Sequence, residues 1–88
     1  MADTEFPDVE IFTTPTCPDC RQLRAWLTLN GVPFSERDLT DPAVAEEAKA
    51  RTGVRVAPIT VIGTSVSYGT FASQRPTLAD LLSLPRGA

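Results

Sequence analysis

The chain has 88 residues, with eight Lys and Arg, eleven Asp and Glu, two Cys and no His, which gives a formal net charge of −3. This length fits one compact domain. The acidic balance argues against nucleic acid as a partner, because phosphate binding needs a basic surface. The absence of His excludes a Ser-His triad and every His-ligated metal site, and two Cys cannot complete a four-ligand zinc site within one chain.

No apolar stretch approaches the length of a membrane-spanning helix, so we expect no membrane contact. Residues 1–10 carry four acidic residues and no apolar run, which is unlike a secretory signal. We therefore expect a cytoplasmic protein, and a monomer. In that compartment a stable structural disulfide is unusual, so a close pair of cysteines is expected to be redox-active or metal-binding.

The first half of the chain predicts a strand, a helix and a second strand. Residues 9–13 are β-branched and aromatic, which is typical of a strand. Residues 18–30 are predicted to form a helix that ends at Asn30-Gly31, because apolar residues recur at helical spacing. Its inward face carries Leu23, Trp26 and Leu27. Residues 33–39 support a second short strand.

The second half predicts a helix, a hairpin and a last helix. Thr40 or Asp41 is suited to the N-cap of a helix that has Pro42 in its first turn and ends at Thr52-Gly53. Residues 59–62 follow Pro58 as a strand, and residues 66–68 are a plausible hairpin partner. The last helix is predicted to start at Pro76 and Thr77. Its inward face is expected to carry Leu78, Leu81 and Leu82.

The predicted order of elements is therefore β-α-β-α-β-β-α. The first β-α-β unit is expected to be parallel with a right-handed crossover, and the hairpin is antiparallel. An α/β architecture satisfies this pattern, with a mixed four-stranded sheet flanked by helices.

The two cysteines stand at the junction of the first strand and the first helix, in the motif Cys17-Pro18-Asp19-Cys20. Pro is favoured at the first helical position, which places Cys17 at the N-cap with its sulfur facing free N–H groups. These donors and the helix dipole stabilise a thiolate, the species that attacks disulfides. Cys20 lies one turn further along, where it is expected to be more buried and close enough to resolve a mixed disulfide.

Charged residues near the motif are expected to affect the Cys17 thiolate in opposite directions. Arg21 and Arg24 would favour a Cys17 thiolate by attraction. Asp19 would oppose it if its carboxylate turned toward the sulfur, whereas its alternative role is to stabilise the helix N-terminus. Two other interpretations of the cysteines are buried packing residues and a metal site shared across a dimer. The position of the pair at a strand-to-helix turn favours the redox interpretation.

The segment Val56-Ala57-Pro58 directly precedes an apolar strand. A proline at this position can be cis, which exposes the backbone N–H and C=O of the preceding residue to an extended substrate. The alternative is an ordinary proline at the start of a strand. The presence of the cysteine pair favours a functional placement.

With these features the chain resembles the glutaredoxin-like branch of the thioredoxin-fold superfamily, including the redoxins of the ribonucleotide-reductase type. The resemblance rests on residues 11–20, 56–58 and 68–71, and it extends over about residues 9–84. It implies a thioredoxin fold in a single domain over residues 1–88, with about 9–84 as the ordered core and short terminal tails. It further implies that Cys17 attacks, that Cys20 resolves, and that Pro58 is a cis proline facing the disulfide. The implied substrate-binding residues are Thr16, Pro18, Ala57, Pro58, Gly69, Thr70 and Phe71.

The resemblance also implies a function, that of a dithiol–disulfide oxidoreductase that reduces protein disulfides or mixed disulfides. Its aromatic-Gly-x-Phe segment and Ala57-Pro58 look like those of redoxins that donate electrons to ribonucleotide reductase and are reduced by thioredoxin reductase. No tightly bound cofactor is expected; the reductant is external, either thioredoxin reductase with NADPH or a low-molecular-weight thiol. The alternatives are a glutathione- or mycothiol-dependent glutaredoxin or mycoredoxin, and a non-catalytic redox-sensing module that switches a surface around Pro58 and Phe71.

Overall fold

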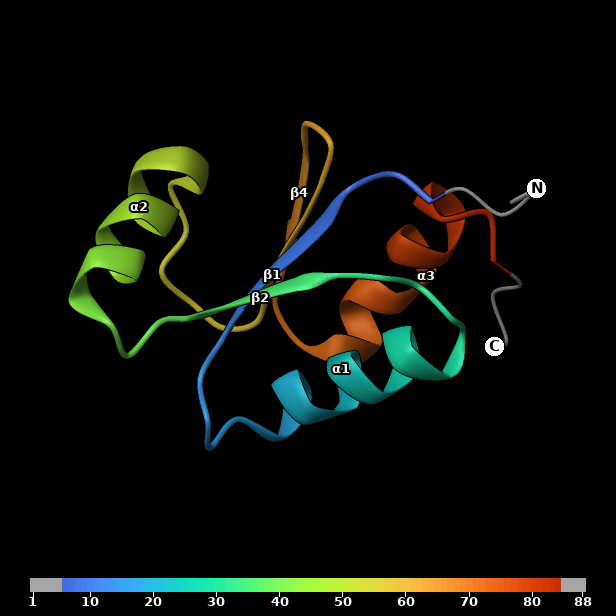
Figure 1. Cartoon of the computed structure of the whole chain (residues 1–88), viewed down its shortest axis with the longest axis horizontal. Helices are drawn as coiled ribbons and strands as arrows, with labels where there is room; N and C mark the ends of the chain where they lie inside the picture. Colours follow the sequence, from blue (N-terminus) through green and yellow to red (C-terminus); the bar gives the residue numbers. More distant parts are fainter. Residues whose placement is uncertain (1–5, 85–88) are drawn as a thin grey trace.

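The computed structural model describes residues 6–84, and its order of elements confirms the prediction (Figure 1). The strands are β1 (Val9–Thr13), β2 (Ser35–Asp38), β3 (Ile59–Ile62) and β4 (Ser65–Tyr68). The helices are α1 (Pro18–Leu29), α2 (Pro42–Thr52) and α3 (Phe71–Leu81). None of these helices within residues 6–84 is long and apolar enough to cross a membrane.

The strands form one mixed sheet in the order β2-β1-β3-β4. As predicted, β1 is parallel to β2, and the β3–β4 hairpin is antiparallel; β1 and β3 also run antiparallel. Phe12 pairs with Ile59, and Ile59 pairs with Tyr68. This register places the end of β1, the start of β3 and the end of β4 at the same end of the sheet.

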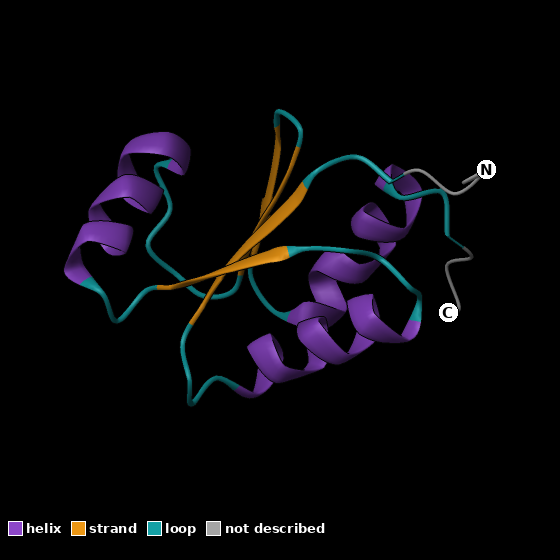
Figure 2. Cartoon of the chain, viewed as in Figure 1, coloured by secondary structure: helices purple, strands orange, loops and turns teal. Residues whose placement is uncertain are grey.

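One face of the sheet is covered by α1 and α3, whereas α2 lies on the other face (Figure 2). The core between the sheet and the α1–α3 pair is apolar, with Ile11, Leu23 and Leu27 fully buried. The two helices also meet through aromatic rings, since Trp26 and Phe71 pack edge to face with centroids 5.8 Å apart. Apolar burial therefore holds the helix that carries the cysteines.

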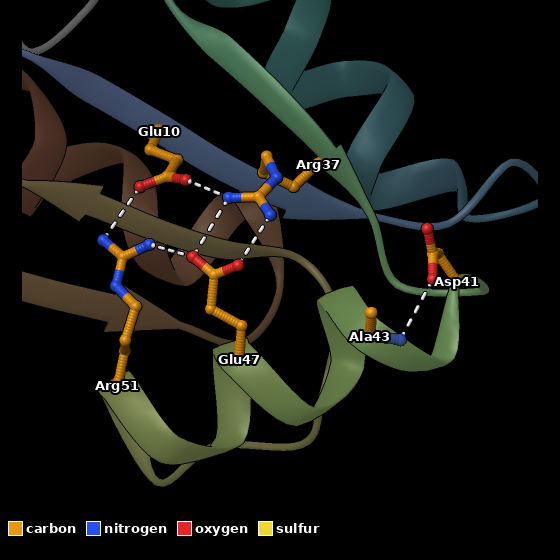
Figure 3. Close-up of polar contacts among 6 residues, drawn as sticks. All are labelled: Glu10, Arg37, Asp41, Ala43, Glu47 and Arg51. Atoms are coloured by element: carbon orange, nitrogen blue, oxygen red, sulfur yellow. Dashed lines mark hydrogen bonds and ion pairs between the residues drawn. The ribbon is translucent and has the colours of Figure 1, made fainter.

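The α2 face combines a small apolar cluster around Phe12 with a ring of four charged residues (Figure 3). Arg37 of β2 and Arg51 of α2 each form ion pairs with both Glu10 of β1 and Glu47 of α2, at N–O distances of 2.7 to 3.0 Å. Both guanidinium groups also lie over the Phe12 ring, 5.8 and 5.6 Å from its centroid. Charge pairing and cation–π contact therefore help to attach α2 to the sheet.

The start of the last helix differs from the prediction. It begins at Phe71 instead of Pro76, and Pro76 lies inside it. The reason is a cap further upstream, because Thr70 Oγ1 accepts the Ser73 backbone N–H at 3.1 Å. The inward face of α3 therefore includes Gln74. It continues through Leu78, Ala79 and Leu82, whereas Leu81, which was predicted to face inward, is 37% exposed.

The charged ring on the α2 face predicts a stability that depends on pH. Hydrogen bonds from Arg51 and Arg37 lower the pKa of Glu10 below its ordinary value of 4.5. A carboxylate with a lowered pKa stabilises the folded protein above pH 4.5, and this contribution is lost as the pH falls through the lowered folded pKa. We expect Glu10→Gln to lower the free energy of unfolding at neutral pH by up to about 1 kcal/mol.

The difference between the wild type and Glu10→Gln should shrink as the pH falls from 7 toward 3, because Glu10 becomes protonated in the wild type. This difference in the free energy of unfolding is measured by urea unfolding, with the fluorescence of the single tryptophan, Trp26, as the signal. A difference of the same size at both pH values would contradict the prediction.

Candidate active site

Cys17 is the N-cap of α1, as predicted. Its backbone is extended, with φ −91° and ψ 115°, and Pro18 follows in the first turn. The Cys17 Sγ accepts the backbone N–H of Cys20 at 3.1 Å. The sulfur therefore receives a hydrogen bond from the helix N-terminus and lies at the positive end of the helix dipole.

Cys20 is the buried member of the pair, with a relative exposure of 0%, and both cysteines are free thiols. Burial, together with a smaller contribution from a hydrogen bond with Cys17, raises the pKa of the Cys20 thiol to about 11. At neutral pH Cys20 is therefore a protonated thiol, whereas the half-buried Cys17 is the sulfur that a reagent can reach. This asymmetry fits an attacking and a resolving cysteine.

Asp19, between the two cysteines, serves a different helix from its own. Its Oδ1 accepts the backbone N–H of Phe71 at 3.0 Å, and Phe71 is the first residue of α3. The Asp19 carboxylate thus satisfies a free donor of α3 and interacts favourably with the dipole of that helix. It ties the cysteine turn to the start of α3.

Arg24 is paired with an acidic side chain, while its charge still acts on the cysteine pair, since it lowers the pKa of Cys20 against the larger effect of burial. Its Nη1 donates to Glu36 Oε2 at 2.6 Å, and the hydroxyl of the buried Thr13 donates to the same oxygen at 2.6 Å. The Arg24 charge is thus paired with Glu36, while Arg21 is exposed to solvent. A cleft of about 360 Å³ adjoins this cluster. It is lined by Thr13, Thr14, Pro15, Arg24, Glu36 and Asp38.

The segment before β3 has the backbone that the family resemblance implied. The Ala57–Pro58 peptide bond is cis, and Pro58 is buried. Neither the N–H nor the C=O of Ala57 forms a hydrogen bond with any of the residues 6–84. Next to it, Val56 is 49% exposed. The segment therefore offers unpaired backbone groups beside an exposed apolar side chain.

The other expected groove residues lie in two places. Thr16 and Pro18 are exposed at the cysteine turn, and Thr70 is exposed as the cap of α3. Gly69 has a φ of +109°, and a Cβ there would stand 3.2 Å from the Ser73 hydroxyl, so only glycine fits without strain. The Phe71 ring is packed against Trp26, which makes it more a core residue than a groove residue.

Gln74 is a residue of this region that the sequence analysis missed. It is buried, with a relative exposure of 2%, and its side-chain amide hydrogen-bonds to the carbonyl oxygens of Pro58 and Gly69. The only signal in the sequence is its position four residues before Leu78, which puts it on the inward face of a helix. This signal can be used only once α3 is known to start at Phe71.

Hydrogen bonds therefore gather three separate segments around the first turns of α3. Asp19 connects the cysteine turn to Phe71, and Gln74 connects α3 to Pro58 and Gly69. The residues expected at the site consequently lie around one end of the sheet. This arrangement can carry out thiol–disulfide exchange beside an unpaired stretch of backbone.

The burial of Cys20 predicts selective alkylation. With iodoacetamide at neutral pH we expect one adduct on the native protein, at Cys17, because Cys20 is buried and protonated. Intact-mass and peptide mass spectrometry locate the adduct, and two adducts should appear after unfolding in guanidinium. In the Cys17→Ser control the native protein should stay unmodified. Rapid modification of Cys20 in the native wild type would disprove the assignment.

The Asp19 contact predicts a stabilising role for a motif residue. Asp19→Ala leaves the Phe71 N–H without its partner and should lower the free energy of unfolding by about 1–2 kcal/mol. Asp19→Asn, the matched control, keeps an acceptor oxygen and loses only the charge, so its loss should stay below about 1 kcal/mol. Urea unfolding of the reduced proteins measures both, and an Asp19→Ala protein as stable as the wild type would count against the contact.

Comparison with solved structures supports the fold. The thioredoxin-like protein BC3987 is 28% identical, with a TM-score of 0.75 over 84% of this chain and 99% of that chain. Glutaredoxin from Brucella melitensis is 29% identical, with a TM-score of 0.67 over 92% of this chain and 94% of that chain. Glutaredoxin from Archaeoglobus fulgidus, at 22% identity and a TM-score of 0.71 over 85% of each chain, shares the fold. The α/β thioredoxin fold is thereby shown.

Curated relatives match a shorter stretch. The global transcriptional regulator Spx 1 of Oceanobacillus iheyensis is 40% identical over 42 residues, which are 47% of this chain and 32% of the regulator. Spx of Enterococcus faecalis is 44% identical over 41 residues, 46% of this chain and 31% of that protein. The match thus covers about a third of these relatives. The model of the family described as "Glutaredoxin", by contrast, matches residues 9–66, which is more than half of the chain. The chain belongs to the glutaredoxin family.

Proposed function

We propose that this chain is a dithiol–disulfide oxidoreductase that reduces protein disulfides or mixed disulfides in the cytoplasm. The observation that carries the proposal is the asymmetric cysteine pair. Cys17 Sγ accepts the Cys20 N–H at 3.1 Å at the start of α1, while Cys20 is buried and its pKa is raised to about 11. Membership of the glutaredoxin family supports thiol–disulfide chemistry in general.

The reaction proceeds in two exchanges. The Cys17 thiolate attacks one sulfur of a substrate disulfide, forms a mixed disulfide with it and releases the other sulfur as a thiolate. Cys20 then gives its proton to the departing substrate sulfur or to water and attacks Cys17. This step forms the Cys17–Cys20 disulfide and releases the reduced substrate. Two electrons have passed to the substrate, and an external thiol or dithiol returns two electrons to the pair.

The substrate groove is formed around the cis proline. The unpaired N–H and C=O of Ala57 are suited to an extended polypeptide that runs beside its disulfide. Thr16, Pro18 and Pro58 would border the disulfide itself. Gly69, Thr70 and the backbone of Phe71 would form the opposite edge. These roles follow from the family resemblance, and the hydrogen bonds that gather the three segments support them.

The reductant that fits best is a protein dithiol such as thioredoxin reductase, which draws its electrons from NADPH. The Asp19 carboxylate already accepts the Phe71 N–H, the first donor of α3. An acidic group at this position disfavours small thiols that carry carboxylates, because like charges repel. Glutathione and mycothiol are the alternative reductants.

A second candidate function is a redox-sensing interaction module. The similarity of about half of this chain to regulators named Spx favours it. In that case the Cys17–Cys20 bond would alter a surface around Pro58 and Phe71, and oxidation would stop after one disulfide per molecule.

Steady-state turnover distinguishes these functions. Consumption of NADPH with a small disulfide or insulin as substrate is compared for thioredoxin reductase and for glutathione with its reductase. We expect repeated turnover of the wild type with thioredoxin reductase, loss of turnover in Cys17→Ser, and a trapped mixed disulfide in Cys20→Ser. Turnover with glutathione alone would reassign the reductant. Oxidation of the cysteine pair without turnover under either system would favour a different thiol, such as mycothiol, or the sensor.

A Cys17→Ser protein that keeps the wild-type rate would show that the roles of the cysteines are wrong. The trapped species is identified by non-reducing electrophoresis and mass spectrometry, and Cys17→Ser should yield no such adduct with insulin.

A further inference from the structure

The buried side-chain amide of Gln74 forms three hydrogen bonds. Its Nε2 donates to Pro58 O and to Gly69 O, each at 2.9 Å, and its Oε1 accepts the Thr60 hydroxyl at 2.7 Å. Because the two carbonyl oxygens can only accept, the nitrogen of the amide must face them, and this determines the orientation of the side chain. Gln74 is thus locked between β3 and the end of β4.

The need for this side chain arises from an interrupted strand pair. Ile59 pairs with Tyr68, so the next pair toward the active site would be Pro58 with Gly69. Pro58 has no backbone N–H, and it cannot donate to the Gly69 carbonyl. Gln74 supplies two donors at this point, one for each carbonyl oxygen. A single side chain therefore holds both strands together where their own ladder stops.

We propose that Gln74 is the positioning residue of the substrate groove. By holding the Pro58 and Gly69 carbonyls, it fixes the distance between the two edges of the groove and the direction of the adjoining Ala57 backbone groups. The inference rests on the proposed oxidoreductase function. Gln74 itself does not contact the reacting sulfurs; it acts through Pro58 and Gly69, so it governs the binding of a polypeptide and leaves the exchange at Cys17 unchanged.

The experiment uses mixed-disulfide formation, which needs no reductase. Gln74→Met is introduced into the Cys20→Ser protein, and the rate of trapping is measured against the concentration of insulin and of 2-hydroxyethyl disulfide, which has no peptide backbone. The half-saturating insulin concentration should rise about tenfold, the size expected when one or two hydrogen bonds that organise the groove are lost. The maximal rate with insulin and the rate with the small disulfide should change by less than about twofold.

Thr60→Val is the matched control. It removes the third hydrogen bond of Gln74 and leaves both bonds to the groove carbonyls in place. The urea midpoint should fall because the Gln74 oxygen loses its partner in the core, but the half-saturating insulin concentration should stay within about twofold of the parent. If Gln74 only stabilised the fold, Gln74→Met and Thr60→Val would differ in their urea midpoints but not in their half-saturating insulin concentrations.

If Gln74→Met does not fold, the double variant Thr60→Val with Gln74→Met carries the test, because replacing both polar partners by apolar groups costs less stability than removing one. The inference is overturned if insulin binding is unchanged without the amide, if Thr60→Val raises the half-saturating concentration equally, or if both substrates slow to the same extent. Failure of the parent Cys20→Ser protein to form any mixed disulfide would overturn the proposed function instead.

Discussion

The missing N–H of Pro58 is the constraint on which the end of the sheet beside the cysteines depends. Without that donor the β3–β4 ladder stops beside the cysteine turn, and the carbonyls of Pro58 and Gly69 need another partner. Gln74 meets this need from the second turn of α3, which is possible only because the helix begins as early as Phe71. The early start in turn relies on the Thr70 cap and on the Asp19 carboxylate.

The two faces of the sheet are stabilised in different ways. On the face that carries the cysteines, α1 and α3 bury a continuous apolar core in which Trp26 and Phe71 meet. On the opposite face, α2 is attached by a small apolar cluster together with the ring of Glu10, Arg37, Glu47 and Arg51. Salt and pH act mainly on the second face, because ion pairs are screened and titrate while apolar burial does neither.

Local signals in the sequence were sufficient for most of the fold. Proline at the first helical position placed Cys17 at the cap of α1, and β-branched runs located β1 and β3 to the residue. The cis bond before Pro58 followed from the family resemblance. The predicted start of α3 was wrong because Pro76 imitates a helix start, whereas the true start uses the Thr70 cap together with Asp19, which lies 52 positions from Phe71. Contacts of this range leave no periodic pattern. The pairing of Arg24 with Glu36 and the role of Gln74 were hidden for the same reason.

The contact of Asp19 with α3 has a consequence for exchanging active-site motifs among redoxins. The two residues between the cysteines stand where their side chains can change the reactivity of the nearby sulfurs. In this chain the second of them also makes a tertiary contact, since its carboxylate accepts the first N–H of α3, the helix that carries Gln74. A dipeptide transplanted from another redoxin would therefore change the scaffold along with the sulfur chemistry. The effect of such a dipeptide would differ from one redoxin to another, because it depends on the helix N-terminus that the second residue contacts.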